Sequence, residues 1–114
     1  MRGIFILFYR VKAILIFICC LGGVAKGSEN VLAGADIGYG EYLSGECVTC
    51  HHSQGLSQGI PSITGLDPES FVWIMRGYRA KEIDHNVMQM VAGRLDDEQI
   101  ASLAVYFGGL PAAE

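Results

Sequence analysis

The sequence is poor in basic residues, and those it has are unevenly placed. Of the eight lysines and arginines, four lie within residues 1–27, whereas all twelve acidic residues lie beyond Ser28. Residues 28–114 therefore carry four basic and twelve acidic side chains, a formal charge of −8. This excess of acid disfavours binding to nucleic acid or to an anionic membrane. It favours a basic surface on a partner protein, or it serves solubility alone.

A long hydrophobic run is also missing, although the N-terminus comes close to one. A basic start is followed by an apolar run over residues 13–21 and small residues over 22–28, the order typical of a secretory signal peptide. We expect a signal peptide over residues 1–27 with cleavage before Ser28; cleavage after Ala25 is the alternative. The run is shorter than the ~20 residues that span a bilayer. The apolar residues 4–9 lengthen it, so an uncleaved membrane anchor is the other possibility.

Cysteine becomes scarce once this leader is removed. Cys19 and Cys20 leave with it, and only Cys47 and Cys50 remain. Two cysteines three positions apart do not make a disulfide framework. Lipid attachment at Cys20 is disfavoured, because small residues do not precede it. The sequence therefore predicts a periplasmic protein with one domain over residues 28–114 and no stabilising disulfides.

Strand patterns and internal repeats are absent, and three segments favour helices. We expect a glycine-containing helix within 37–50 that ends at Cys50, a loop over 52–66 and an irregular stretch over 80–86. Asp67, Pro68 and Glu69 have the order of an N-cap and first turn. Asp96, Asp97 and Glu98 likewise combine an N-cap residue with acidic side chains in the first turn of a helix. Apolar residues at helical spacing follow each start: Phe71, Ile74, Met75 and Tyr78 after the first, and Ile100, Leu103, Ala104 and Phe107 after the second. The fold class is all-α, with three to five short helices.

The motif that indicates the chemistry is Cys47-Val48-Thr49-Cys50-His51. Two cysteines separated by two residues and followed at once by histidine indicate covalent attachment of one c-type haem. Each thiol would add to a haem vinyl group, and His51 would place an imidazole nitrogen on the iron. A thioredoxin-like dithiol or half of a zinc site would need only the two cysteines, and His51 argues against both.

The second iron ligand has several candidates. Met88 and Met90 lie between the two later helices, and histidine–methionine ligation is an established electron-transfer pairing. If their segment is irregular, spacing alone does not separate them, and both can also be apolar filler. His85 would give bis-histidine ligation. Met75 lies on an apolar stripe and is expected in the core. His52 adjoins His51 and is expected in a loop.

With a methionine 37 residues after His51 and a capped final helix, the chain resembles a class I c-type cytochrome between about Gly40 and Leu110. The resemblance implies that Gly40, seven residues before Cys47, lets the first and last helices cross against an aromatic of the run Leu103-Ala104-Val105-Tyr106-Phe107. It also implies that the carbonyl region of Pro61 orients the histidine on the iron.

A narrower resemblance covers Leu66–Phe71, Met75–Arg79 and Val87–Ala101, which are similar to the haem subunit of flavocytochrome c sulfide dehydrogenase. In that family the ligand methionine precedes the cap of the last helix by eight positions, which selects Met88. A spacing of six, known in short bacterial cytochromes, would select Met90. The chain departs from the pattern at His52, where the family usually has glycine.

Together these features predict a periplasmic electron-transfer protein with one covalent haem. It would bind the haem through Cys47, Cys50, His51, Pro61 and Met88, with His51 and Met88 on the iron. The redox partner would be a protein, which the narrower resemblance implies is a flavoprotein sulfide dehydrogenase subunit, and the chain would not be catalytic on its own. The alternative is a haem enzyme or ligand sensor with a labile sixth site that uses His85 or His52. A structural haem-binding module is a third reading.

Overall fold

The computed structural model describes residues 30–52 and 59–113, which form four helices and no strand. The helices are α2 (Ile37–Val48), α3 (Pro68–Arg79), α4 (Asn86–Ala92) and α5 (Asp97–Gly108). The predicted all-α class is confirmed over this part of the chain. The signal peptide, its cleavage site and Cys20 lie outside the described residues. None of the four helices combines the length and the apolar character that a membrane crossing requires.

Aspartate side chains fix where three of the helices begin. Asp36 accepts a hydrogen bond from the Tyr39 N–H at 2.6 Å, and Asp67 accepts one from the Ser70 N–H at 2.9 Å. At the start of α5, Asp96 and Gln99 form a reciprocal capping box. Each carboxylate satisfies a backbone donor that has no partner within its helix. The predicted starts of α3 and α5 are confirmed, whereas the cap at Asp36 was not predicted.

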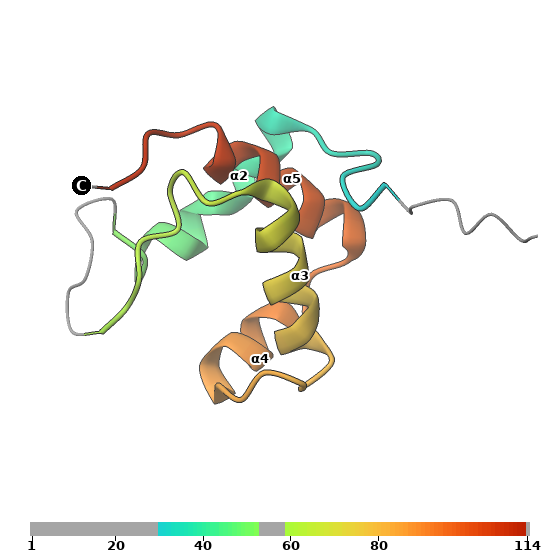
Figure 1. Cartoon of the computed structure of the whole chain (residues 1–114), viewed down its shortest axis with the longest axis vertical. Coiled ribbons are helices and arrows are strands. Elements are labelled where there is room, and N and C mark those ends of the chain that lie inside the picture. The colour runs from blue at the N-terminus through green and yellow to red at the C-terminus, as the bar shows by residue number, and fades with distance from the viewer. Residues whose placement is uncertain (1–29, 53–58, 114) are drawn as a thin grey trace, which may run out of the picture.

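Helices α2 and α5 cross in direct backbone contact (Figure 1). Gly40 is buried at the crossing, and a Cβ atom there would overlap the Ser102 carbonyl and lie 2.8 Å from the Tyr106 Cβ. Only a residue without a side chain allows the two backbones to come this close. The expected role of Gly40 in the crossing is thus confirmed.

The core lies between α3 and α5 and extends to α2 and α4. Its fully buried members include Val72, Ile100 and Phe107, and the rings of Phe71 and Phe107 stack with centroids 5.9 Å apart. Both predicted apolar stripes contribute to it. The remaining buried hydrophobic members are Met75, Ala92, Leu103 and Ala104.

One expectation about an irregular segment needs correction. No helix was predicted for the segment that contains Met88 and Met90, but it forms α4, which begins at Asn86, the last residue of the expected irregular stretch. Residues 30–36, which precede α2, pack against the rest of the fold. Val31 and Leu32 contact the core, and the Asp36 N–H donates to the Ser102 hydroxyl at 3.0 Å. The expected irregular stretch holds from Ala80 to His85, and the expected loop holds over residues 59–66.

Candidate functional site

The two cysteines and the histidine of the motif lie at the C-terminal end of α2. Cys47 is the penultimate residue of the helix, and its carbonyl accepts hydrogen bonds from the Cys50 N–H at 3.2 Å and the His51 N–H at 2.8 Å. The chain therefore makes one more helix-like turn beyond Val48. Residues three and four positions apart share a face of such a turn. The turn thus places both thiols and the imidazole on one side.

The imidazole of His51 is held by a backbone carbonyl. Its Nδ1 atom lies 2.6 Å from the Pro61 oxygen. A carbonyl oxygen can only accept a hydrogen bond, so Nδ1 must carry the proton and donate it. With its proton on Nδ1, the neutral form of the ring has an unprotonated Nε2, and this is the form in which histidine binds a metal. Pro61 therefore contacts His51 as the sequence analysis expected.

The environment of Cys47 disfavours the thiolate form of its side chain. Burial raises the pKa of the Cys47 thiol above its ordinary value, and the neighbouring Glu46 carboxylate raises it further. The thiol also lies at a helix C-terminus, where the helix dipole disfavours a negative charge. Reactive cysteines of dithiol oxidoreductases have lowered pKa values, often at helix N-termini. This arrangement therefore argues against a thioredoxin-like use of the two cysteines.

A cavity of about 430 Å³ opens beside Cys47. Its lining comes from α2, from α5 and from the end of α4 and the turn after it. An ion pair between Glu46 and Arg94, 3.3 Å long and exposed on both sides, lies among the lining residues. The other lining residues are Tyr42, Leu43, Gly45, Val91, Leu95 and Leu103. The cavity offers a mostly apolar surface next to the first cysteine.

Helix α4 separates the two candidate methionines. Residues two positions apart in an α-helix point about 200° apart around its axis. Met88 is half-buried and contacts the hydrophobic core, whereas Met90 is 63% exposed. Met75 is buried in the core as expected. Of the methionines on α4, only Met88 faces the interior of the molecule.

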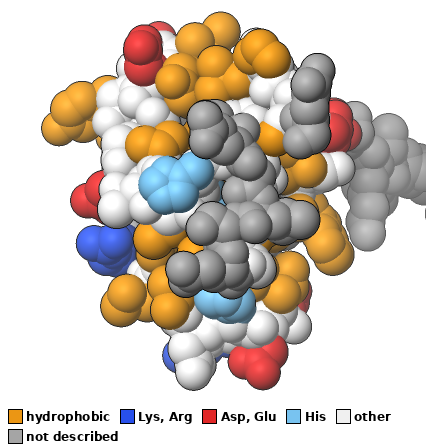
Figure 2. Space-filling view, turned by 90° about the vertical axis from the view of Figure 1, so that its left-hand side faces the viewer, with side chains coloured by type: hydrophobic (Ala, Val, Ile, Leu, Met, Phe, Trp, Pro, Cys, Tyr) orange, Lys and Arg blue, Asp and Glu red, His pale blue; other side chains and the backbone are white. Residues whose placement is uncertain are grey.

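The remaining histidines have different surroundings. His85 is the N-cap of α4: its Nδ1 accepts a hydrogen bond from the Met88 N–H at 3.2 Å, and its ring meets Tyr78 edge-on. His52 is exposed. On the face shown in Figure 2, histidine side chains lie among hydrophobic ones. His85 thus has a structural role at the start of the helix that carries Met88.

The site residues predicted from the sequence fall into two groups. Cys47, Cys50, His51 and Pro61 lie together at the end of α2 and the loop that returns to it, and Met88 lies on α4. The Glu46–Arg94 pair beside the cavity was not predicted, and its only signal in the sequence is the position of Glu46 next to the motif. Comparison with protein-family models and with curated proteins gives no match for this chain.

Proposed function

We propose that this chain is a periplasmic monohaem c-type cytochrome that transfers electrons and has the class I cytochrome c fold. The observation that carries the proposal is the hydrogen bond from His51 Nδ1 to the Pro61 carbonyl, within a motif of two thiols and a histidine. This bond leaves Nε2 as the only nitrogen of the ring that can bind iron. It also fixes the orientation of the ring, as second-shell acceptors do for metal-binding histidines.

Each residue of the site has a definite task in this proposal. Cys47 and Cys50 would hold one haem c through thioether bonds, and the imidazole nitrogen of His51 and the sulfur of Met88 would bind its iron. The bound haem supplies a one-electron ferric–ferrous couple, whose potential a methionine ligand raises. Leu43 and Leu103 line the cavity beside Cys47 with aliphatic surface. Such surface excludes water and lowers the local dielectric constant.

The close crossing of α2 and α5 supports the class I fold. Gly40 meets the backbone of Ser102 and the Cβ of Tyr106, which is the contact implied by the resemblance to class I cytochromes. The motif follows directly from α2, and a methionine that faces the interior precedes α5. The helices that would enclose a haem are thus in the order that the resemblance implies.

The partner that fits this chain best is a redox protein with a basic surface. The described residues carry ten acidic and four basic side chains. Three of the four basic ones, Arg76, Arg79 and Arg94, form ion pairs with acidic neighbours. A flavoprotein subunit of a sulfide dehydrogenase is the specific partner that the resemblance suggests. The substrate chemistry would then belong to that subunit, and this chain would accept the electrons.

Acid–acetone extraction of the purified mature protein tests the haem. Thioether-bound haem stays with the polypeptide, so we expect the red colour to remain with the protein and the mass to exceed that of the polypeptide by one haem. In the variant with both Cys47→Ser and Cys50→Ser, which keeps His51, haem should be extracted completely. Free extraction of haem from the wild type, or a mass equal to that of the bare polypeptide, would refute the proposal.

A further inference from the structure

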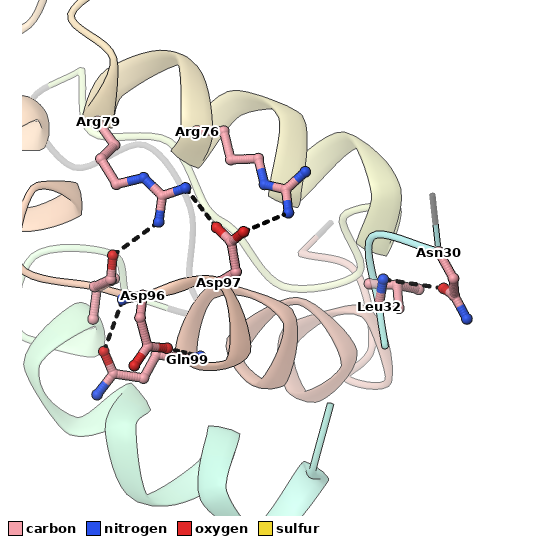
Figure 3. Close-up of polar contacts among 8 residues, drawn as sticks. Asn30, Leu32, Arg76, Arg79, Asp96, Asp97 and Gln99 are labelled. Atoms are coloured by element: carbon pink, nitrogen blue, oxygen red, sulfur yellow. Dashed lines mark hydrogen bonds and ion pairs between the residues drawn. The ribbon is translucent and has the colours of Figure 1, made fainter. Parts of the chain in front are cut away.

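Arg76 and Arg79 of α3 both form ion pairs with the carboxylate of Asp97 at the start of α5 (Figure 3). Arg76 donates from Nη2 to one oxygen of Asp97 at 3.0 Å, and Arg79 donates from Nη2 to the other oxygen at 2.5 Å. Both arginine side chains are about a third exposed, and Asp97 is 57% exposed. Exposed ion pairs of this kind contribute little to stability by themselves.

Arg79 makes one further bond that Arg76 lacks. Its Nη1 donates to the backbone carbonyl of Leu95 at 3.0 Å, in a partly buried position. Leu95 lies in the turn that joins α4 to α5, lines the cavity beside Cys47 and packs against the core. Arg79 therefore ties the end of α3 to this turn, while Asp97 holds the guanidinium in the orientation that the bond requires.

Helix α4 depends on such ties. It has seven residues, and a helix this short is not stable without tertiary contacts. Among the described helices, α4 packs against α3. Its N-terminal side is held by the His85 cap and by a bond from the Gln89 amide to the Ile83 carbonyl at 2.9 Å. The bond from Arg79 to Leu95 is the corresponding tie on the C-terminal side.

We propose that Arg79 is a positioning residue that keeps segment 86–95 closed against α3 and thereby holds Met88 in place. Its guanidinium bridges two groups: Nη1 donates to the Leu95 carbonyl and Nη2 donates to the Asp97 carboxylate. We call this pair of bonds the Arg79 clip. The proposal has two parts. The role of the closed segment in keeping Met88 on the iron rests on the proposed function above, whereas the control of segment opening by Arg79 does not depend on haem.

Hydrogen exchange read by mass spectrometry tests the clip in the purified wild-type, Arg79→Gln and Arg76→Gln proteins. Arg76→Gln is the matched control, because it removes the same charge from the same carboxylate but leaves the bond to Leu95. Loss of a hydrogen bond from a charged donor typically costs enough to change a local equilibrium about tenfold or more. We expect amides of residues 86–95 to exchange about tenfold faster in Arg79→Gln, with peptides of α2 and α5 unchanged in both variants. Equal acceleration in the two variants, or none, would overturn the proposal.

Binding of imidazole to the ferric wild-type protein and variants tests the consequence for Met88. An external ligand can reach the iron only after the methionine has moved away, so the binding rate reports opening of the segment. We expect faster binding in Arg79→Gln than in Arg76→Gln, by the same factor as the exchange rates. Arg79→Lys keeps the charge but has no planar fork, so it should resemble Arg79→Gln.

The two assays separate the possible failures. If exchange responds to Arg79→Gln but the wild-type protein contains no haem, the clip stands and the proposed function fails. If haem and Met88 are bound but Arg79→Gln matches Arg76→Gln in both assays, the proposed function stands and the clip fails. Unfolding of Arg79→Gln as a whole, seen as faster exchange in α2 and α5 as well, would assign Arg79 a general structural role instead.

Discussion

At the scale of single residues, two glycines of α2 differ sharply in what surrounds them. A Cβ atom on Gly40 would overlap the Ser102 carbonyl and lie 2.7 Å from the carbonyl carbon, whereas a Cβ on Gly45 would meet nothing within 4 Å. The neighbour of Gly40 is backbone and cannot turn away as a side chain could. The same substitution should therefore have opposite effects at the two positions.

We expect Gly40→Ala to lower the free energy of unfolding by about 2 kcal/mol or more, because the added methyl group would push α2 and α5 apart where they cross. Gly45→Ala should raise it by roughly 0.5–1 kcal/mol, because alanine restricts the unfolded chain and favours the helix. Urea denaturation followed by circular dichroism measures both. Destabilisation of similar size at both positions would contradict the crossing as described.

The methionines of α4 offer a second comparison between single residues. In the proposed cytochrome, Met88→Ala should abolish the weak near-infrared band that arises from sulfur bound to ferric iron, and it should lower the reduction potential, since thioether ligation raises it. Met90→Ala should leave the band intact, because Met90 points to solvent. The reverse result would make Met90 the ligand. Survival of the band in both variants would be inconsistent with either methionine as sole ligand.

At the scale of secondary-structure elements, acidic side chains at helix starts connect stability to pH. The hydrogen bond from Arg79 lowers the pKa of Asp97 below its ordinary 3.8; partial burial opposes this, and the charge of Arg76 supports it. A hydrogen bond from the Ser70 backbone N–H likewise lowers the pKa of Asp67. A group whose pKa is lower in the folded state binds protons more tightly when unfolded. Its contribution to the free energy of unfolding is therefore fully present above about pH 4 and is lost as the pH falls through the pKa of the group in the folded state.

We expect the free energy of unfolding of the wild type to fall as the pH is lowered below about 4, and to fall less steeply in Asp97→Asn. Asparagine cannot titrate, so the variant lacks one of the groups that couples folding to proton uptake. Urea denaturation at a series of pH values measures the slope. Parallel slopes for the two proteins would show that the ion pairs of Asp97 add nothing to the acid sensitivity.

The helices also show what the sequence could and could not predict. Helices α3 and α5 were predictable because Asp67, Pro68 and Asp96 are strong local start signals. Helix α4 was missed because it is short and its N-cap is His85, a residue without a strong capping preference. The packing of Val31 and the bond between Asp36 and Ser102 join residues that are far apart in sequence, so no local pattern reports them.

The candidate site divides in the same way. The motif at Cys47–His51 is a local signal and could be predicted from spacing alone. The choice of Met88 over Met90 rested on a resemblance, and the helical conformation of α4 now provides an independent reason for it. The bond from Arg79 to Leu95 could not be predicted, because its acceptor is a backbone carbonyl and carries no mark in the sequence.

At the scale of the whole molecule, charge should govern association with a partner. Opposite charges raise the rate at which two proteins meet, and salt screens this effect over a distance of about 10 Å at 0.1 M ionic strength. We expect reduction of this protein by the flavoprotein partner proposed above to slow as ionic strength rises, and reduction by a small uncharged hydroquinone to remain unchanged. Stopped-flow absorbance measures both rates. A partner reaction that is insensitive to salt would leave the acidic surface with a role in solubility alone.

The crossing of α2 and α5 has a further consequence, for the time at which the chain can fold. It joins the first and the last of the described helices, with more than sixty residues between Gly40 and Tyr106. Contacts this distant in sequence form late, because a long loop must close before they can contribute. Among the described helices, α2 packs only against α5, so on the ribosome this part of the core cannot form until α5 has been made. This order would suit the export proposed above, since a chain that crosses a membrane in an extended state must not become compact before its last helix has been made.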